Sequence, residues 1–334
     1  MKTIKKQPFN DIHLELKEST DGKWIVEINR CQDVRKNRTS QQMTLREWLI
    51  HYIDKKKAAY SRGTIMGYIS IMKILEKYGD SILLKSVDKE YCKGFIDFIS
   101  QPIESRYGGK RDLSASSIYR YYEIFSSIIN AAVRAKLLEK NPLQDIERSE
   151  KPHRVESRRH FLSIEEVQKL INTSAKREDV KQAFLFSCFC GLRWSDISQI
   201  RWKDIEENNG RVYANIVMKK NKEPLYLPLN EPCRRFMPKK MSVSNGEDFV
   251  FKTLPTCQTA NYVIRNWADS AGITKKVSFH VARHTFATIS LTLGADIYTT
   301  SKLLGHSNIM VTQVYAKVVN KKKNEVVDLF NTVF

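Results

Sequence analysis

The chain has 334 residues, of which 42% are hydrophobic and 10% aromatic, enough to fill the cores of two domains of ordinary size. A wholly disordered chain is therefore excluded, and no run of about 18 apolar residues is present that could span a membrane. The net charge of +19 favours a polyanionic partner, of which nucleic acid is the usual one. The same charge would also suit a ribosome-associated protein, a protein that binds membrane surfaces, or a chain whose charge serves solubility only.

The first forty residues are expected to form an N-terminal extension or a short arm. Residues 24–29 alternate weakly between apolar and polar side chains and follow a turn signal at 20–22, which favours a strand. The N-terminus is basic but no apolar segment follows it, so no secretory signal is expected.

Residues 41–150 carry four amphipathic patterns with helical spacing, which predicts a compact helical domain. The first pattern opens with Thr44 and Glu47, a Thr-x-x-Glu combination that caps helix starts. Asn141 and Pro142 end the last pattern, because the residue before a proline disfavours helical backbone. The other three helices are expected to begin at Ser61, at Ser86, and at Ser114 or Ser116.

Residues 151–160 are polar and basic and are expected to form a linker. Residues 161–334 are predicted to form a second domain that ends in a C-terminal tail. A second capping pattern, Ser163 with Glu166, opens this domain. The chain is therefore expected to divide close to the linker.

The second domain is predicted to be mostly helical with one β interruption. A turn signal at 208–210 precedes a β-branched run at 211–218, and residues 225–229 offer a short partner strand. Helical patterns return further along the chain, at 258–272, 279–294, 297–304 and 310–319. The expected fold class is mainly α with a small β-hairpin or sheet.

Side chains suited to phosphate chemistry recur in short blocks of the second domain. One block follows a glycine at the end of an apolar run, one follows the predicted strand, and two contain histidine near helix ends. His280 and Arg283 are three residues apart, which puts them on one face of a helix. In chain order the blocks supply Arg193, Lys219 with Lys220 and Lys222, His280, Arg283, His306 and Tyr315.

These blocks resemble the tyrosine recombinase family of phage-integrase type, which carries an arginine, a hairpin lysine, His-x-x-Arg, a second histidine and a nucleophilic tyrosine in that order. The resemblance covers about residues 159–319, and the preceding helical segment resembles the family's core-binding domain. It implies the catalytic set Arg193, Lys219, His280, Arg283, His306 and Tyr315.

The resemblance also implies a function. Such an enzyme is a site-specific recombinase that cuts and rejoins duplex DNA through a covalent 3′-phosphotyrosine intermediate, and so integrates, excises or inverts a DNA element. The expected partners are double-stranded recombination sites, three further copies in a synaptic homotetramer, and accessory DNA-bending proteins, with no membrane. The expected location is the bacterial cytoplasm, at the nucleoid, and no cofactor is expected because the covalent link conserves the energy of the phosphodiester.

The chemistry of transesterification fits these residue types. Arg193 and Arg283 suit the non-bridging phosphate oxygens, because a guanidinium presents several donors in one plane and stays charged at cellular pH. Tyr315 suits the attack, although a phenol with a pKa around 10 is mostly protonated at neutral pH and needs activation. His280 and His306 are expected to hold or protonate phosphate oxygens, or to assist removal of the tyrosine proton.

A lysine is the candidate acid for the leaving 5′-oxygen, and three lysines compete for this role. Lys219 matches the family's hairpin position, whereas Lys220 and Lys222 are its neighbours. The sequence here is Lys-Lys-Asn-Lys-Glu, where many members of the family carry Lys-Gly-Asn-Lys-Glu. Lys219 is therefore the preferred assignment.

No metal site is expected. His280 and His284 are four residues apart, a spacing that can chelate zinc, but Val281 stands where the zinc-protease pattern requires glutamate. His284 is expected to pack or hydrogen-bond as a structural neighbour of Arg283. Cys188 and Cys190 have no second pair nearby, so all six cysteines are expected to be reduced.

Three rival functions remain open from the sequence. A type IB topoisomerase-like enzyme would use the same residue types as a monomer, and a catalytically silent DNA-binding protein would bind DNA without a covalent product. An RNA-binding protein would account for the charge but not for the ordered blocks.

Residues 325–334 have an apolar face, which favours a tail that packs on a neighbouring subunit or on its own domain. Neither the target site nor the direction of recombination follows from the sequence.

Overall fold

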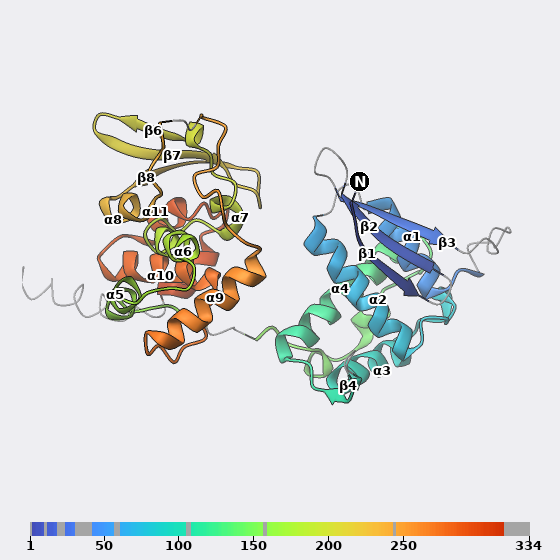
Figure 1. Ribbon diagram of the computed structural model, residues 1–334. Coiled ribbons are helices and arrows are strands. Elements are labelled where there is room, and N and C mark those ends of the chain that lie inside the picture. Colours follow the sequence, from blue (N-terminus) through green and yellow to red (C-terminus); the bar gives the residue numbers. More distant parts are fainter. Residues whose placement is uncertain are drawn as a thin grey trace, which may run out of the picture. The chain divides into compact units, whose positions relative to one another are not determined.

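The computed structural model describes residues 2–9, 12–18 and 24–30 as backbone strands, and residues 42–56, 61–104, 108–155, 159–242 and 245–316 with side chains, except those of Lys56, Arg62 and Ala316. The chain divides into two compact units, Met1–Ser157 and Arg158–Phe334, called the N-terminal and C-terminal units below (Figure 1). Each unit is described by itself.

The N-terminal unit begins with a three-stranded antiparallel sheet in the order β1-β2-β3. The register pairs Phe9 with Ile12 and Glu18 with Trp24, so both connections are hairpins. The strand predicted at 24–29 is confirmed as β3, and two strands precede it. The three strands are β1 (Lys2–Phe9), β2 (Ile12–Glu18) and β3 (Trp24–Arg30).

The four helices predicted between residues 41 and 150 are all present. They are α1 (Leu45–Lys56), α2 (Arg62–Tyr78), α3 (Lys89–Ser100) and α4 (Ala115–Arg134). Smaller elements are the 3₁₀ turns η2 (Leu84–Ser86), η3 (Pro142–Asp145) and η4 (Arg148–Glu150), and the paired strands β4 (Ile103–Glu104) and β5 (Lys110–Arg111).

Side-chain caps explain where these helices begin. The Glu47 carboxylate accepts from the Thr44 backbone N–H, and the Glu47 N–H donates back to the Thr44 hydroxyl. Ser61 and Ser114 cap α2 and α4. The start predicted at Ser86 is wrong, because Ser86 ends a 3₁₀ turn and Asp88 caps α3. Both are short polar side chains that favour helix starts, so the pattern alone did not separate them.

The core of the N-terminal unit is apolar and well packed. Phe95 and Phe125 are fully buried, and their ring centroids lie 4.5 Å apart between α3 and α4. Trp48 on α1 donates its indole N–H to the Ile128 carbonyl of α4 at 3.1 Å.

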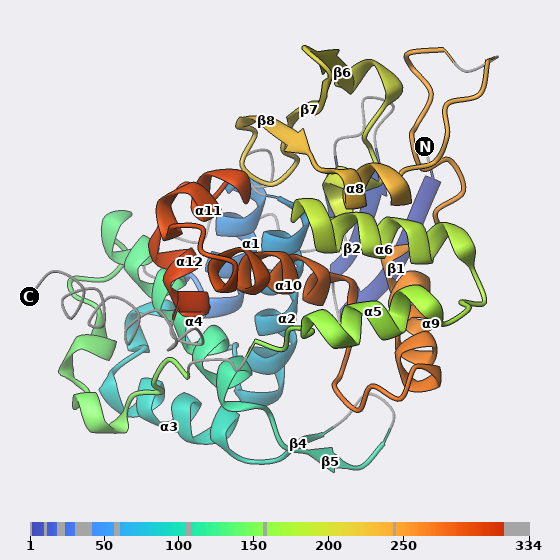
Figure 2. The ribbon, with the colours of Figure 1, turned by 90° about the vertical axis from the view of Figure 1, so that its left-hand side faces the viewer.

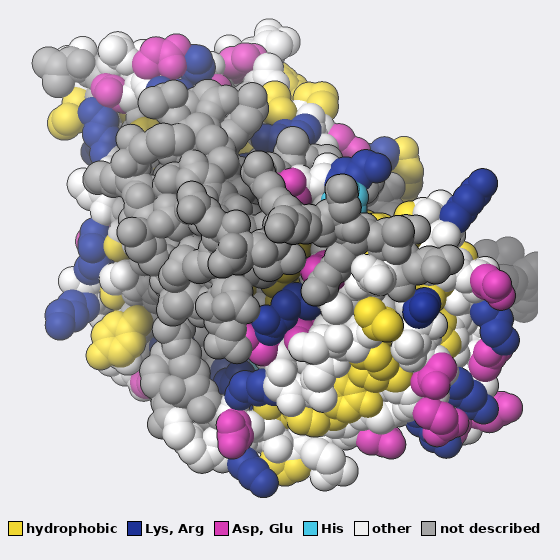
Figure 3. Space-filling model, turned by 90° about the vertical axis from the view of Figure 1, so that its right-hand side faces the viewer, with side chains coloured by type: hydrophobic (Ala, Val, Ile, Leu, Met, Phe, Trp, Pro, Cys, Tyr) yellow, Lys and Arg dark blue, Asp and Glu magenta, His cyan; other side chains and the backbone are white. Residues whose placement is uncertain are grey.

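On the face drawn in Figure 3, lysine and arginine side chains are interspersed with acidic ones over the described residues.

The C-terminal unit is mostly helical. Its helices are α5 (Ile164–Asn172), α6 (Glu178–Cys190), α7 (Trp194–Ile197), α8 (Glu231–Phe236), α9 (Cys257–Ser270), α10 (Phe279–Thr292), α11 (Ile297–Leu303) and α12 (Met310–Ala316), with the 3₁₀ turn η5 (Trp202–Asp204). The capping box predicted at Ser163 and Glu166 is present at the start of α5. All four helical patterns predicted after residue 257 correspond to helices, and α12 is described as far as Ala316.

A three-stranded antiparallel sheet interrupts these helices in the order β6-β7-β8. Asn209 and Gly210 both have positive φ, the backbone of a tight hairpin turn, between β6 (Ile205–Asn208) and β7 (Arg211–Val217). Val217 pairs with Pro224 of β8 (Pro224–Leu229), so residues 218–223 form the second connection. This connection carries the three candidate lysines.

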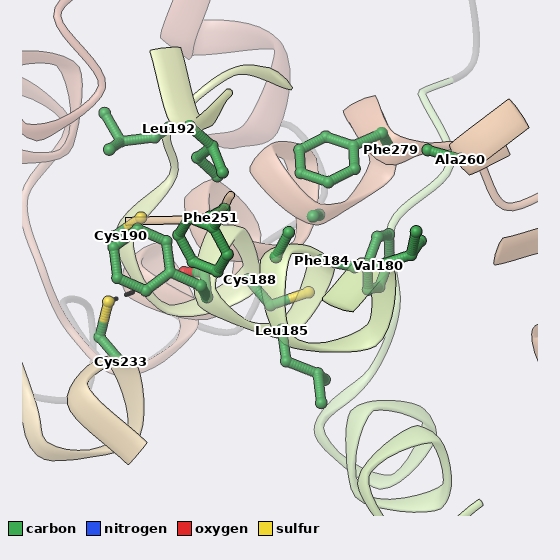
Figure 4. Packing of buried hydrophobic residues seen from close by; sticks show 14 of the residues in the cluster. Val180, Phe184, Leu185, Cys188, Cys190, Leu192, Cys233, Phe251, Ala260 and Phe279 are labelled. Carbon is green, nitrogen blue, oxygen red and sulfur yellow. Dashed lines mark hydrogen bonds between the residues drawn. The ribbon is translucent and has the colours of Figure 1, made fainter. Parts of the chain in front are cut away.

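Helix α6 lies at the centre of the C-terminal core. The ring of Phe184 makes edge contacts with Trp267 of α9 and Phe279 of α10, with centroids 5.8 and 6.0 Å apart. Figure 4 shows Phe184 and Phe279 among the buried side chains of this core. A helix that is apolar all round is enclosed by its neighbours, and the residues of α6 from Ala183 to Cys188 are buried. Helix α10 contacts both α6 and α12 (Figure 2), so residues from distant parts of the sequence meet around α10.

Over the described residues, no helix is long and apolar enough to cross a membrane. The described cysteines are free thiols, and no group of three histidine, cysteine or acidic side chains among these residues is arranged to hold a metal ion. The predicted tail at 325–334 and the end of the helical pattern at 317–319 lie outside the described residues.

Candidate active site

Gly191 allows the first arginine block to approach α10. It ends α6 in the left-handed conformation with φ of 75°, where a side chain would be strained. A Cβ here would also lie 2.6 Å from the ring of Phe286 and 2.9 Å from Leu304. The chain can therefore turn sharply against α10, and Arg193 follows two residues later at the N-cap of α7.

Arg283 is the most deeply buried charge of the site. It is 2% exposed and donates to the carbonyls of Gly191 at 2.8 Å and Leu304 at 2.6 Å. Burial and the nearby charge of Arg193 lower the pKa of Arg283 to about 9, so it remains a cation at neutral pH. These bonds fix the guanidinium between the end of α6 and the end of α11.

Asp196 connects Arg193 to the lysine-bearing connection. Its Oδ1 accepts from the backbone N–H of Lys219 at 3.0 Å, and its Oδ2 lies 3.9 Å from Nη1 of Arg193. Asp196 is 5% exposed, and its Oδ2 has no hydrogen-bond partner among the described residues. Burial lowers the pKa of Arg193, while Asp196 opposes this shift. Asp196 was not part of the predicted catalytic set, although its position three residues after Arg193 allows the two to pair.

Met218 and Gly305 bring the β7–β8 connection beside the second histidine block. Nη1 of Arg193 lies 3.5 Å from Sδ of Met218, and a Cβ on Gly305 would overlap the Met218 side chain. The amide of Asn221 donates to the Gly305 carbonyl at 3.4 Å. His306, the next residue, is thus held close to the candidate lysines.

His280 and His306 are neutral at physiological pH. Although His280 is exposed as a residue, partial loss of solvent around its ring and the charges of Arg283 and Arg193 lower its pKa to about 4. The same causes lower the pKa of His306 to about 3, and its Nδ1 lies 2.8 Å from the Thr312 hydroxyl. A neutral imidazole still offers one N–H donor to a phosphate oxygen.

The structure distinguishes two of the three lysines that compete for the role of the acid. The Lys219 backbone is bound by Asp196, and its side chain is exposed. The lysine whose charge lowers the pKa of both His280 and His306 is Lys220. The electrostatic influence of Lys220 on the histidines therefore makes it a serious alternative for proton donation.

Tyr315 lies inside the C-terminal unit and has two polar partners that had no predicted role in its chemistry. It is 3% exposed, and its hydroxyl lies 2.6 Å from Nδ1 of His284 and 3.0 Å from Nη1 of Arg159. His284 was expected to be a structural neighbour of Arg283, but its hydrogen bond is to the tyrosine. Arg159 was assigned to the linker. It is one of several basic residues there, and nothing in the pattern distinguished it from the others.

The structure brings most of the predicted residues together in one region. Tyr315 is hydrogen-bonded to His284, the residue that follows Arg283 on α10, and it packs in one buried cluster with Leu304, whose carbonyl accepts from Arg283. A cavity of about 320 Å³ has Arg193, His280 and Arg283 in its wall, whereas Tyr315 is not among its lining residues. Such a site can bind an anion and deliver a phenol to it.

Known proteins match both units of the chain. Residues 160–322 match the phage integrase family, and residues 44–150 match the phage integrase SAM-like domain. A tyrosine recombinase XerC of Caldanaerobacter subterraneus subsp. tengcongensis is 30% identical over 265 residues, which cover 75% of this chain and 70% of that protein. A tyrosine recombinase of Pseudothermotoga lettingae is 27% identical over 273 residues, which cover 79% of this chain and 91% of that protein.

Solved structures share the fold. The integrase of transposon Tn1549 in complex with circular intermediate DNA has a TM-score of 0.64 at 18% identity, over 82% of this chain and 95% of that one. A lambda integrase tetramer bound to a Holliday junction has a TM-score of 0.63 at 14% identity, over 90% of this chain and 96% of that one. The chain belongs to the phage integrase family of tyrosine recombinases. It is an enzyme of site-specific DNA recombination.

Proposed function

We propose that this recombinase cuts and rejoins duplex DNA through a 3′-phosphotyrosine formed by Tyr315. The phenolic oxygen attacks the phosphorus, the bond from phosphorus to the 5′-oxygen breaks, and that oxygen takes a proton and leaves as a hydroxyl. Attack by a 5′-hydroxyl of the partner strand reverses these steps and releases the tyrosine. The bond energy is conserved throughout, so no nucleotide cofactor is needed.

Arg193 and Arg283 hold the non-bridging oxygens of the phosphate in this proposal, and His280 and His306 donate further hydrogen bonds to them. The observation that supports it most is that Tyr315 of α12 is hydrogen-bonded to His284, the residue that follows Arg283 on α10. Tyr315 also packs in one buried cluster with Leu304, whose carbonyl accepts from Arg283. Cations that are fixed before the substrate arrives stabilise a developing charge without reorganisation.

Lys219 is proposed as the acid that protonates the leaving 5′-oxygen. Support comes from its place at the start of the β7–β8 connection, where Asp196 binds its backbone N–H beside Arg193. A lysine on such a connection can move toward the phosphate when DNA binds. Lys220 is the alternative, because its charge acts on both site histidines.

The proposed partners are double-stranded recombination sites, and the proposed assembly is a homotetramer on two synapsed sites, with accessory DNA-bending proteins. The family membership and the DNA complexes of the Tn1549 and lambda integrases support this. We assign DNA binding around the crossover to residues 41–150, catalysis to 161–334, the connection to 151–160, and an arm to 1–40. The proposed location is the bacterial cytoplasm, at the nucleoid, and residues 325–334 are proposed to pack on a neighbouring subunit.

The test is a nicked suicide duplex built from the DNA that flanks the gene, incubated with the full-length protein in EDTA. The expected product is a covalent protein–DNA adduct at the 3′-phosphate on a denaturing gel. Tyr315→Phe should abolish the adduct, whereas Tyr262→Phe, an exposed tyrosine of α9, should leave it unchanged. An adduct that persists in Tyr315→Phe contradicts the assignment of the nucleophile.

Two further outcomes would replace the proposed function. Relaxation of supercoiled plasmids that lack a recombination site, by a monomer, would favour a topoisomerase of the same chemistry. Salt-dependent DNA binding with no covalent product would favour a silent DNA-binding protein.

A further inference from the structure

The hydroxyl of Tyr315 is enclosed by two groups outside the proposed catalytic set. Nη1 of Arg159 lies 3.0 Å from Oη, and the guanidinium carbon lies 5.3 Å from the centroid of the tyrosine ring. Nδ1 of His284 lies 2.6 Å from the same oxygen. Both groups therefore touch the atom that would attack phosphorus.

Arg159 is bound to this region by its own segment of chain. Three residues later, the backbone N–H of Leu162 donates to the hydroxyl of Thr285 at 2.9 Å, and Thr285 is completely buried on α10. The neighbouring carbonyl of Phe161 accepts from Lys275 at 3.1 Å. These bonds fix the path of the chain along α10, next to the helix turn that carries His284.

The directions of the two hydrogen bonds follow from their donors. A guanidinium only donates, so Oη must accept from Arg159. The hydroxyl proton is then free to point at Nδ1 of His284, which accepts it when the imidazole is neutral and carries its own proton on Nε2. Burial and the neighbouring side chains of His280, Arg159, Arg283 and His306 lower the pKa of His284 to about 3, so the ring is neutral at cellular pH.

We propose that His284 is the general base that takes the proton of Tyr315, and that Arg159 stabilises the phenolate through its direct hydrogen bond. This inference rests on the proposed role of Tyr315 as the nucleophile. The proton moves from Oη to Nδ1, the electron pair left on Oη forms the new bond to phosphorus, and the departing 5′-oxygen takes a different proton, from the lysine. When the 5′-hydroxyl attacks in the reverse step, His284 returns its proton to the tyrosine.

The substrate itself strengthens this base. In the free protein the imidazolium is disfavoured because it would stand among Arg159, Arg283 and the other site cations. A phosphodiester bound by Arg283 and Arg193 brings a negative charge into the same region and offsets that repulsion. His284 is therefore unprotonated and ready before binding, and becomes able to accept the proton when the phosphate is in place.

The other two histidines of the site are arranged differently. His306 has its Nδ1 directed at Thr312, and His280 makes a ring contact with His284 at a centroid distance of 4.4 Å. Among the described residues, His284 is the histidine that is hydrogen-bonded to the tyrosine hydroxyl. This geometry gives His284 the role of base for the tyrosine and leaves His280 and His306 as donors to the phosphate.

The decisive measurement is the pH dependence of single-turnover cleavage of the suicide duplex by His284→Asn. Asparagine can keep a hydrogen bond to Oη but cannot take the proton. We expect a rate about 100-fold lower than wild type at pH 7, the usual contribution of a general base. The variant's rate should rise about tenfold per pH unit between pH 6 and 9 as hydroxide replaces the base, whereas the wild-type rate should be nearly flat. His160→Asn, an exposed histidine beside Arg159, should behave as wild type.

A more acidic nucleophile provides an independent readout. Replacing Tyr315 by a difluorotyrosine should restore most of the cleavage lost in His284→Asn, because less help is then needed to remove the proton. Arg159→Ala should lower the rate on the order of tenfold to a hundredfold, with partial recovery in Arg159→Lys, and difluorotyrosine should rescue it too. If His284→Asn does not fold, the Arg159 variants carry the same test.

The outcomes separate this inference from the proposed function. Cleavage by His284→Asn at the wild-type rate and without pH dependence, while Tyr315→Phe is inactive, would overturn the base and leave the nucleophile intact. Failure of difluorotyrosine to rescue variants that bind the duplex as wild type would show that His284 and Arg159 only pack against the tyrosine. An adduct in Tyr315→Phe would instead contradict the proposed function.

Discussion

The two units of the chain bury polar groups in different ways. Among the described residues of the N-terminal unit, the buried polar side chains are those of Asp80 and Asn141, and both are structural: Asp80 pairs with Arg46 at 2.6 Å, and Asn141 caps a 3₁₀ turn. The C-terminal unit buries Arg283 and His284, and it also buries Asp196, whose Oδ2 has no hydrogen-bond partner among the described residues.

This difference concerns how each unit accommodates a buried charge. A buried charge without an oppositely charged group in direct contact is costly, because burial disfavours the charged form. The first unit avoids that cost by pairing the buried Asp80 with the part-buried Arg46, whereas the second buries the cation of Arg283 without such a contact. Arg283 is bonded to two carbonyls and keeps its charge available, so its environment is suited to a phosphate and not to stability alone.

The largest expected effect comes from removing one arginine in each unit. Arg283→Ala should lower the rate of adduct formation on the order of 10²- to 10³-fold, since it removes a fixed cation from the site. Arg46→Ala breaks the pair with Asp80 and should lower the free energy of unfolding by about 1–3 kcal/mol while the cleavage rate at low temperature changes little. Quenched-flow cleavage and urea titration measure the two quantities. Equal losses of cleavage in both variants would contradict the view that Arg283 serves catalysis and Arg46 serves stability.

The second expected effect distinguishes the lysines. Loss of the acid for the leaving oxygen should slow cleavage about 100-fold in Lys219→Ala and only slightly in Lys220→Ala. A duplex with a 5′-thiolate leaving group needs no acid, and should restore the rate of whichever variant has lost the donor. Rescue of Lys220→Ala and not of Lys219→Ala would transfer the role to Lys220.

A smaller effect is expected at Asp196. Asp196→Asn keeps the shape but removes the negative charge between Arg193 and the Lys219 backbone, so cleavage should fall roughly tenfold. The matched change Asp80→Asn in the N-terminal unit should lower stability without changing the rate of the chemical step. Urea midpoints measure the loss of stability and single-turnover rates measure the loss of cleavage in the two variants. A loss of cleavage in Asp80→Asn as large as that in Asp196→Asn would contradict this prediction.

The smallest effect concerns pH and stability. His284 has a pKa of about 3 in the folded protein against about 6.5 when unfolded, so the unfolded chain binds more protons in between. The contribution of His284 to stability is therefore complete above about pH 7 and falls as the pH drops toward 3. Between pH 7 and pH 5 the full-length protein should lose about 1–2 kcal/mol more than His284→Asn in urea unfolding. An equal loss in both proteins would show that His284 does not carry the titration.

Much of the fold could be predicted because local signals agree with it. Helix caps at Thr44, Ser61 and Ser163, the turn at Asn209 and Gly210, and the helical spacing of apolar residues all depend on a few neighbouring positions. At Ser86 the local signal was misleading, because Ser86 ends a 3₁₀ turn and Asp88, two residues later, caps α3.

The sequence by itself determined the kinds of chemical group and their order along the chain: two arginines, lysines on a connection, two histidines and a tyrosine. Tertiary structure alone decided which groups meet the tyrosine hydroxyl. Arg159 and Tyr315 are 156 residues apart, and their hydrogen bond exists because α10 contacts α12 while the segment before α5 is bound along α10. Hydrogen bonds act over about 3 Å and follow the folded path of the chain, so periodicity and spacing carry no record of them.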